Sequence, residues 1–392
     1  MLNLCADLHI HIGQAEGRAV KITASRQLDL RTILFQDAPR KGLDVVGVVD
    51  AGTLPVSREL EQMIQSGEMV ELKGGGFLAR NGVLLIAGCE LESIEGVHWI
   101  IFLPHLKNLQ EYQRFMRSRV HNQQLSTQKT RINARELVNL SCMLDGILCP
   151  AHAFTPHKGI YGCWAERIET ALEKDSKQIR VIELGLSADT ELAACIQETR
   201  QFAFLSNSDA HSSANIGREY NLLRMKSKDF KEFRYCLENT QGRRIMANFG
   251  LDPRLGKYHR SYCPVCSTVA SEPPPVFKCS KCGSDKIIMG VYDRIASIQD
   301  REQPSHPVSR PPYYYRVPVN QLPGIGPKMY QKLLAFFDNE IMLAESALEQ
   351  DIARVAGNKT ASIIIKMRTG RLTIIPGGGG HYGKILKSDY WQ

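Results

Sequence analysis

Short apolar runs that alternate with amphipathic stretches constrain the first 250 residues of this chain more than any other feature. The amphipathic stretches include residues 57–67, 166–175 and 190–200. The apolar runs, many of them β-branched, cover residues 1–9, 43–51, 82–92, 98–104, 146–154, 179–187 and 202–211. Strand–helix alternation predicts βαβ units and a mostly parallel sheet or barrel. The number of candidate strands favours a closed or nearly closed barrel.

Most of these runs end at a residue of a type that can bind a metal ion. In "ADLHIHIG" (6–13), Asp7, His9 and His11 alternate and would share one face of a strand. The other such residues are Asp50, Glu90, His152, Asp209 and His211. Parallel barrels gather residues of this kind at the C-terminal ends of their strands. Any one alone is more often an ordinary surface or core residue, but together they predict a multinuclear metal site.

The composition predicts a soluble protein with a basic C-terminal part. Hydrophobic residues make up 43% and charged residues 23% of the 392 residues. No run of 18 apolar residues occurs, and Asp7 and His9 interrupt a signal-peptide pattern, so we expect an untargeted cytoplasmic protein. Residues 251–392 carry 19 Lys/Arg against 12 Asp/Glu, whereas residues 1–250 carry 30 against 29. This excess predicts a polyanionic partner, nucleic acid before an acidic membrane.

Four of the eleven cysteines form two C-x-x-C pairs separated by twelve residues. They are Cys263, Cys266, Cys279 and Cys282. Four thiolates at this spacing predict a tetrahedral structural Zn²⁺ site with no position left for water. The alternative, free thiols or disulfides, is a poor match for this spacing. The other seven cysteines are scattered, mostly in apolar stretches, and are expected to be reduced core thiols.

Two glycine-containing turns in the C-terminal region predict binding to phosphate. "VNQLPGIGPKMYQKLLAFF" (319–337) places Gly324, Gly326 and Lys328 before an amphipathic helix and resembles a helix-hairpin-helix motif. A second, degenerate copy at 352–367 has Gly357 and Lys359 at the turn. Backbone N–H groups at a helix start bind phosphate. The alternative is an ordinary helical capping domain.

Changes in residue composition along the chain divide it into four parts. We expect a barrel over 1–250, a small zinc-ribbon-like module over 251–292, a linker or extended surface strap over 293–317, and an all-α region over 318–392. The glycine-rich tail could be mobile, or its Tyr382 and Lys384 could form part of a DNA-binding surface.

Five segments of the first part resemble the successive motifs of the PHP (polymerase and histidinol phosphatase) superfamily. They are "DLHIH" (7–11), "CELES" (89–93), "GVHWIIFL" (96–103), "CPAHAF" (149–154) and "SNSDAH" (206–211). The resemblance implies a distorted seven-stranded β/α barrel that hydrolyses phosphoesters with two or three divalent metal ions. It implies these ligands: His9, His11, Asp50, Glu90, His98, His152, Asp209 and His211.

The resemblance also assigns these ligands to sites. His9 and His11 would hold one ion with Glu90 and Asp209, and Glu90 would bridge to a second ion bound by His98 and His152. Asp209, His211 and Asp50 would face a third ion. Many relatives have histidine where this chain has Asp50, and a further histidine that "GQAEGRAVKI" (13–22) lacks. Two ions are therefore expected to be Zn²⁺, and the third site could prefer Mg²⁺ or Mn²⁺ or stand empty.

The order of all parts resembles the endonuclease Q family over nearly the whole chain. The segments "GLSAD" (185–189), "SDAHSSANIGRE" (208–219) and "GGGGHYG" (377–383) add to this resemblance. It implies a metal-dependent endodeoxyribonuclease of EC class 3.1 that cuts damaged DNA on the 5′ side of uracil, hypoxanthine, xanthine or an abasic site. Glu90, Asp209 and His211 would be its catalytic residues.

Two other functions fit parts of the sequence. A small-molecule phosphatase of the histidinol-phosphatase type would leave the cysteine cluster and the glycine hairpins unexplained. A catalytically inactive DNA-binding protein would leave the ligand set unexplained. For the endonuclease, we expect base-pocket residues in the loops at 154–155, 187–189 and 212–215. We expect a monomer, with a sliding clamp as a candidate partner, although no clamp-binding motif is clear enough to name.

Overall fold

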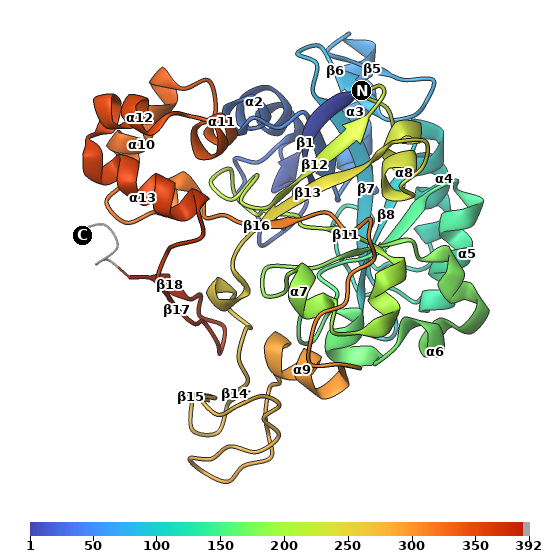
Figure 1. The fold of residues 1–392 in the computed structure, drawn as a ribbon. Helices are drawn as coiled ribbons and strands as arrows, with labels where there is room; N and C mark the ends of the chain where they lie inside the picture. The colour runs from blue at the N-terminus through green and yellow to red at the C-terminus, as the bar shows by residue number, and fades with distance from the viewer. Residues whose placement is uncertain (387–392) are drawn as a thin grey trace.

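A mixed sheet around β1 is the central element of the fold (Figure 1). The computed structural model describes residues 1–386. From β1 outward, the strands that pair one after another are β1 (Leu2–Ile10), β4 (Val45–Val48), β7 (Leu84–Glu92), β8 (His98–Leu103) and β9 (Ile147–Pro150). The first two pairings are parallel and the last two are antiparallel. The sheet is thus mixed, whereas the sequence pattern predicted a mostly parallel one.

The short connection between β7 and β8 explains the change of direction. Only residues 93–97 join the two strands, and Gly96 has φ +82°. A parallel connection would need a crossover of about a dozen residues or more, so these two strands pair as a hairpin. As a result, His98 at the start of β8 lies opposite Glu92 at the end of β7. The hairpin therefore places His98 at the end of the sheet where the parallel strands finish.

The remaining strands extend the sheet or lie beside it. On the other side of β1, the sheet continues through β12 (Tyr220–Met225), β13 (Arg244–Gly250) and β16 (Tyr313–Tyr315). β6 (Phe77–Ala79) and β5 (Met69–Glu71) extend the sheet from β7. β10 (Val181–Glu183) and β11 (Ala203–Leu205) form a separate parallel pair. Each of the seven predicted runs thus contains a strand.

Hydrogen bonds join the β10–β11 pair to the strands on both sides. Ala153, just after β9, donates its N–H to the carbonyl of Glu183 at 2.8 Å. Ala210, beyond the end of β11, forms a parallel bridge to Ile10 of β1. One hydrophobic cluster receives side chains from all seven of these strands: Leu8, Val45, Ile86, Ile100, Cys149, Val181 and Leu205. The seven strands therefore share one core.

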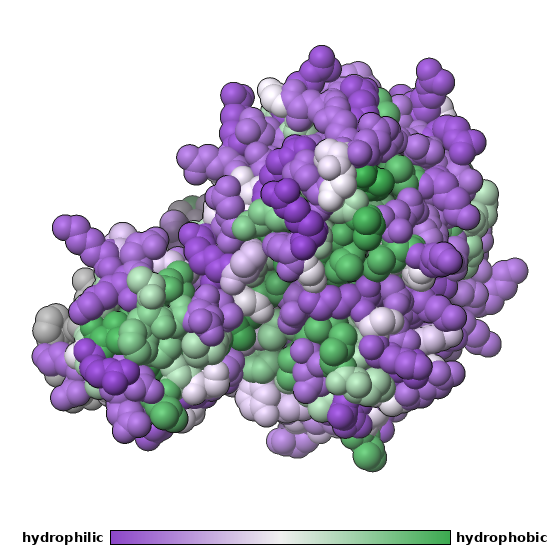
Figure 2. Space-filling model, turned by 90° about the horizontal axis from the view of Figure 1, so that it is seen from above, coloured by the Kyte–Doolittle hydropathy of each residue, from purple (hydrophilic) through white to green (hydrophobic). Residues whose placement is uncertain are grey.

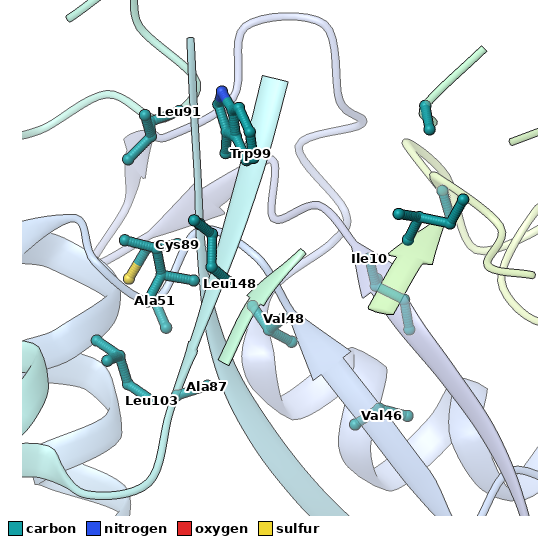
Figure 3. Packing of buried hydrophobic residues seen from close by; sticks show 14 of the residues in the cluster. Ile10, Val46, Val48, Ala51, Ala87, Cys89, Leu91, Trp99, Leu103 and Leu148 are labelled. Atoms are coloured by element: carbon teal, nitrogen blue, oxygen red, sulfur yellow. The ribbon is translucent and has the colours of Figure 1, made fainter. Parts of the chain in front are cut away.

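A second core covers the other face of the strands, where most of the helices pack, whereas the helix at Phe230–Leu237 packs in the first cluster. Figure 3 shows side chains of β1, β4, β7, β8 and β9 in this cluster, including Val48, Trp99 and Leu148. Both faces of β7 are buried, which is why its sequence is a nearly continuous apolar run. The helices of this part are α1 (Leu30–Thr32), α2 (Ala38–Lys41), α3 (Leu54–Gln65), α4 (Leu106–Met116), α5 (Ala134–Met143), α6 (Ile168–Leu172), α7 (Thr190–Ala193) and α8 (Phe230–Leu237).

The chain after residue 250 forms three further structures. The short hairpin β14 (Tyr262–Cys263) and β15 (Thr268–Val269) carries part of the cysteine cluster. α9 (Val291–Ile298) packs on the helix-covered core and is followed by an extended segment that leads to β16 (Figure 1). Four helices then pack around a separate hydrophobic core: α10 (Pro327–Phe336), α11 (Glu340–Glu345), α12 (Glu349–Ala356) and α13 (Asn358–Arg368).

The end of the described chain forms one more hairpin, of β17 (Ile374–Ile375) and β18 (Lys384–Ile385). The last six residues of the expected 318–392 region lie outside the described residues. Seen from above, the surface is mostly hydrophilic with smaller hydrophobic patches between (Figure 2). No helix among residues 1–386 is both long and apolar enough to cross a membrane.

A buried ion pair fixes the four-helix unit to the rest of the fold. The Lys41 ammonium at the end of α2 is 2.6 Å from Glu340 of α11, and Lys41 is only 2% exposed. Glu340 also accepts hydrogen bonds from the Tyr330 hydroxyl at 2.5 Å and the Val319 N–H at 2.9 Å. The Lys41 ammonium also donates to the carbonyl of Ala214 at 3.2 Å. The pair therefore ties the helical unit to the loop that follows residue 211.

The substitution Lys41→Met tests the contribution of this ion pair. It keeps the length of the side chain but leaves the Glu340 carboxylate buried without its cation, which typically costs about 3–5 kcal/mol of stability. Urea-induced unfolding followed by circular dichroism measures this loss. Exposed Lys107→Met is the matched control and should change stability by less than about 0.5 kcal/mol. Equal stabilities of the two variants would contradict the role assigned to Lys41.

Candidate metal centre

His9, in the first strand, and His11, just after its end, face each other and are each held by a carboxylate. His9 Nδ1 is 2.8 Å from Glu183, and His11 Nδ1 is 3.0 Å from Asp50. A carboxylate oxygen can only accept here, so both Nδ1 atoms donate and a neutral ring keeps its lone pair on Nε2. The two Nε2 atoms are 3.3 Å apart. Two lone pairs that face each other at this distance need a cation between them.

Glu90 and Asp209 complete a four-donor group around the two histidines. His9 Nε2 lies 3.6 Å from Glu90 and 3.5 Å from Asp209. His11 Nε2 lies 3.4 Å from each of the same two carboxylates. Two donors of a tetrahedral ion with bonds of about 2.1 Å are about 3.4 Å apart. The separations therefore fit a divalent ion such as Zn²⁺.

A second group shares Glu90. Its Oε1 lies 3.1 Å from Nδ1 of His98 and 3.6 Å from Nε2 of His152, and these three residues together could hold an ion. His98 reaches the group because β8 runs antiparallel to β7. Glu90 thus offers oxygens to two groups of nitrogen donors, as a bridging carboxylate does between adjacent ions.

A third group is formed by His11, Asp209 and His211. His211 is less buried than His9 and His11, and its side chain is 30% exposed. Asp209 has φ +46°, and His152 of the second group has φ +31°. Non-glycine residues adopt this left-handed conformation at a cost of about 1–3 kcal/mol, and such strain clusters at functional sites. The strained backbone places both side chains in the centre.

Asp50 has a different place from the one that the resemblance implied. One of its oxygens faces His11 Nδ1, and the other accepts the Ile12 N–H at 2.6 Å. None of the groups of donor atoms that could hold an ion includes it among the described residues. Its position is that of an outer carboxylate that orients a ligand histidine.

Sequence reasoning missed Glu183, which does for His9 what Asp50 does for His11. Glu183 is the last residue of β10 and is completely buried. The same pattern that drew attention to Glu90, an acidic residue at the end of an apolar run, could have found it. Asp7, in contrast, faces away from the donor groups and accepts the N–H groups of Ser208 at 3.1 Å and Gly217 at 2.9 Å. It shapes the loop that carries Asp209.

The acidic and basic groups of the centre shift one another's pKa values toward the charged forms. Burial by itself lowers the pKa of His9, but Glu183, Asp209 and Glu90 outweigh it and raise the pKa to about 10. Without a metal ion, Nε2 of His9 therefore carries a proton, and a bound ion would displace this proton and take its place between the two rings. Burial alone would raise the pKa of Glu90, yet Lys21 and His98 hold it well below its usual value. The pKa of Asp209 is likewise lowered by His9 and His11 against the effect of burial. The carboxylates are thus ionised and create a strong attraction for cations.

The donor groups line a pocket of roughly 670 Å³. Glu90, His98, His152, Asp209 and His211 all contribute to its wall. Of the loops expected to form a base pocket, Thr155 and Ser187 line it, whereas no residue of 212–215 does. Its rim also includes Lys21, Lys158, Lys257 and Tyr258. Cationic and aromatic side chains suit an anionic ligand with a planar group.

The four cysteines converge as the spacing predicted. The Sγ atoms of Cys263 and Cys282 are 3.7 Å apart, and those of Cys266 and Cys279 are 3.5 Å apart. These separations are far too long for a disulfide. They fit thiolates at the corners of a tetrahedron with Zn–S bonds of about 2.3 Å. The cluster therefore fits a divalent ion held by sulfur alone.

The predicted DNA-binding residues lie on the four-helix unit and on the final hairpin. Gly324 has φ +82°, and Gly326 precedes α10, whose first turn includes the exposed Lys328. Gly357, with φ +84°, joins α12 to α13, and Lys359 is exposed in the first turn of α13. Both positions leave backbone N–H groups of a helix start at the surface.

The two tail residues lie elsewhere, Lys384 in β18 and Tyr382 just before it. Tyr382 and Lys384 line a pocket of about 500 Å³ together with Arg218 and Gln321. Lys257, on the rim of the metal-centre pocket, has its ammonium 6.0 Å from the ring of Tyr382. The tail hairpin therefore adjoins the rim of the metal-centre pocket.

Comparisons with known proteins cover the whole chain. No protein-family model matches it. The uncharacterized protein YqxK of Bacillus subtilis is 39% identical over 98% of this chain and 100% of its own length. The lesion-specific endonuclease PfuEndoQ from Pyrococcus furiosus has a TM-score of 0.85 at 32% identity, over 98% of this chain and 95% of that one. Endonuclease Q in complex with a 27-mer duplex substrate with an abasic lesion at the active site has a TM-score of 0.84 at 31% identity, over 100% of this chain and 98% of that one.

The substitution Asp50→Asn tests how His11 is oriented. An amide cannot accept from both the Ile12 N–H and His11 Nδ1, so its NH₂ group would face Nδ1 and shift the proton to Nε2. We expect metal affinity to fall by about 10–100-fold, as for other outer carboxylates. Competition with a chromophoric chelator measures it. Asp44→Asn, at the opposite end of β4, is the control, and equal affinities for the two variants would refute the orienting role.

The substitution Cys279→Ser tests the cysteine cluster. Removal of one thiolate should lower the tightly bound zinc by about one equivalent per chain, measured by elemental analysis. Proteolysis should also become faster within residues 260–290. Cys142→Ser, which replaces an exposed thiol of α5, is the control and should change neither readout. Full zinc content in Cys279→Ser would argue against a metal at this cluster.

Proposed function

The chain belongs to the endonuclease Q family, and from this membership and its metal-competent centre we propose that it is a DNA-repair endonuclease. The single observation that carries the proposal is the convergence of imidazole and carboxylate donors at tetrahedral separations on the wall of a pocket of roughly 670 Å³. Donors grouped in this way can bind metal ions, and such ions activate water for the hydrolysis of a phosphodiester without a nucleophilic side chain.

We propose three positions for divalent ions. His9, His11, Glu90 and Asp209 would hold the first, and Glu90 would bridge to the second, held by His98 and His152. His211 and Asp209 would serve a third, with Asp50 acting on it only through His11. When bound, such ions lower the pKa of water and stabilise the charge that develops on the phosphate.

The chain's own residues would position and balance the reacting groups. Lys21 has its ammonium 3.4 Å from Glu90 and lines the pocket, so it would neutralise part of the charge of the substrate phosphate. Thr127 donates to the same carboxylate at 2.7 Å and holds its orientation. His211 Nδ1 donates to the carbonyl of Asp209 at 3.0 Å, which leaves the Nε2 lone pair free to bind an ion or accept a proton. Glu90, Asp209 and His211 are therefore the proposed catalytic residues.

The substrate we propose is duplex DNA with a deaminated base or an abasic site, cut on the 5′ side of the lesion. A pocket of roughly 670 Å³ has room for a nucleotide that has been flipped out of the duplex. Thr155 and Ser187 on its wall could hydrogen-bond to an altered base edge, and Tyr258 could stack on it. The products would be a 3′ hydroxyl and a 5′ phosphate.

The other parts would bind the DNA backbone. We propose that residues 1–250 are a distorted seven-stranded β/α barrel, 251–292 a structural zinc module, 293–317 a connecting strap and 318–392 a helix-hairpin-helix region. The two exposed glycine turns at 324–326 and 357 would each offer N–H groups to a phosphate, with Lys328 and Lys359 beside them. Tyr382 and Lys384 would contact DNA between these turns and the pocket.

Cleavage of end-labelled duplexes tests this proposal. Duplexes with one uracil, one hypoxanthine, one abasic site or no lesion are incubated with the protein and Mg²⁺ or Mn²⁺. We expect a single cut 5′ to each lesion and none in the undamaged duplex. Cleavage of all four alike would leave a nuclease without lesion recognition. Release of phosphate from small monoesters without any DNA cleavage would replace the proposal with a phosphatase.

The substitution Asp209→Asn separates cleavage from binding. It replaces the charged carboxylate of a metal ligand by a neutral amide, so the cleavage rate should fall by about 10²–10³-fold or more. Affinity for the lesion duplex, measured by fluorescence anisotropy, should change by less than about threefold because most backbone contacts lie elsewhere. Exposed Asp145→Asn is the control and should leave both unchanged. An equal loss of binding and cleavage would count against Asp209 as a catalytic residue.

A further inference from the structure

A second pocket with a strongly basic lining lies at the other end of strands β10 and β11 from the metal centre. It has a volume of about 300 Å³. The arginines that line it are Arg180, Arg200, Arg244 and Arg310. Glu238 is the one acidic residue in its described lining. Arg180 directly precedes β10, and Glu183 ends this strand, so about 10 Å of strand separates this pocket from the metal centre.

These arginines have no acidic partners among residues 1–386. Arg200 donates to the Ser305 hydroxyl, and Arg310 donates only to backbone carbonyls. Arg243, one residue before Arg244, shows the usual alternative, because it forms an ion pair with Glu232 at 2.7 Å. The guanidinium groups around the pocket therefore keep an uncompensated positive charge.

Arg310 is held rigidly in place before any ligand binds. Its Nη1 and Nη2 atoms donate to the carbonyls of Phe202 at 2.7 Å and Thr199 at 2.9 Å, and its guanidinium lies 3.5 Å from the ring centre of Phe204. Its Nε is buried without a hydrogen-bond partner. Burial and the nearby charge of Arg200 lower the pKa of Arg310 to about 10. An anion in the pocket would relieve the repulsion between these two guanidinium groups.

We propose that this pocket binds a small anion with two or more phosphate groups, such as inorganic pyrophosphate or a nucleoside diphosphate. Guanidinium groups match phosphate oxygens with paired hydrogen bonds, and four of them exceed what a single negative charge needs. Gln201, Asn239 and Ser309 in the lining add neutral hydrogen-bonding groups. A concave site of about 300 Å³ suits a small molecule and cannot admit a duplex.

The ligand would join segments that are far apart in the sequence. Arg310 belongs to the extended segment between α9 and β16, Arg244 begins β13, and Arg180 directly precedes β10. Three further residues of that segment, Pro307, Ser309 and Pro311, also line the pocket. An anion held by all these groups would fasten the segment to the strands. Binding should therefore also stabilise the folded chain.

Isothermal titration of the metal-loaded full chain with inorganic pyrophosphate, and separately with ADP, tests this site. The double variant R180Q/R244Q removes two exposed positive charges. Among the described residues, the side chains of these two arginines make one other contact, from Arg244 Nε to the sulfur of Met246. We expect the wild-type chain to bind pyrophosphate and the double variant to bind it about tenfold or more weakly. Pyrophosphate bound at the metal centre contributes equally to both proteins, so the difference reports the arginine pocket.

The matched control is Arg114→Gln, whose side chain on α4 is 76% exposed. It should bind pyrophosphate like the wild type. Equal affinity for pyrophosphate and ADP would show that phosphate alone is recognised, and tighter binding of ADP would add the nucleoside to the site. Equal binding by the wild type and R180Q/R244Q would overturn the proposal. A loss of duplex affinity in the double variant, with unchanged pyrophosphate binding, would overturn it in favour of a contact with the DNA backbone.

Discussion

The chemistry of this protein depends on two buried carboxylate–imidazole hydrogen bonds. Glu183 and Asp50 hold the Nδ1 atoms of His9 and His11, and this alone decides that both Nε2 lone pairs point inward. Glu90 and Asp209 then meet those lone pairs at separations that suit one ion. Each carboxylate comes from a different strand end, so the centre exists only when β1, β4, β7, β10 and the loop after β11 are all in register.

The parts of the chain that would bind DNA are tied to this centre by short physical links. Lys41 contacts both Glu340 of the helical unit and the carbonyl of Ala214, three residues after His211. Lys257 connects the pocket rim with Tyr382 of the tail hairpin. The interface between units is therefore not a flexible linker but a set of buried or stacked contacts, which fixes the distance between the metal ligands and the proposed backbone-binding turns.

The two ends of the strands carry opposite charge. Carboxylates and the imidazoles that they hold dominate the end with the metal centre, and the unpaired arginines of the second pocket dominate the other. A buried apolar core, including Val181 and Leu205, separates the two. About 10 Å of strand lies between the two groups of charges, so these arginines do not reach the carboxylates of the metal centre to form ion pairs, and each group stays available to an added ion.

Residue type and spacing were enough to identify the residues that carry the chemistry: strand-end His, Asp and Glu for the centre, two C-x-x-C pairs for the cysteine cluster, and glycine turns before helices. Strand periodicity and ligand type are local properties, so they can be read without the fold. The way in which the strands pair could not be predicted in this manner: β8 runs antiparallel and thereby places the expected ligand His98 beside Glu90, while Asp50 lies behind His11 and Glu183 behind His9. These roles depend on which atoms meet across distant strands, and a linear pattern contains no information on such distances.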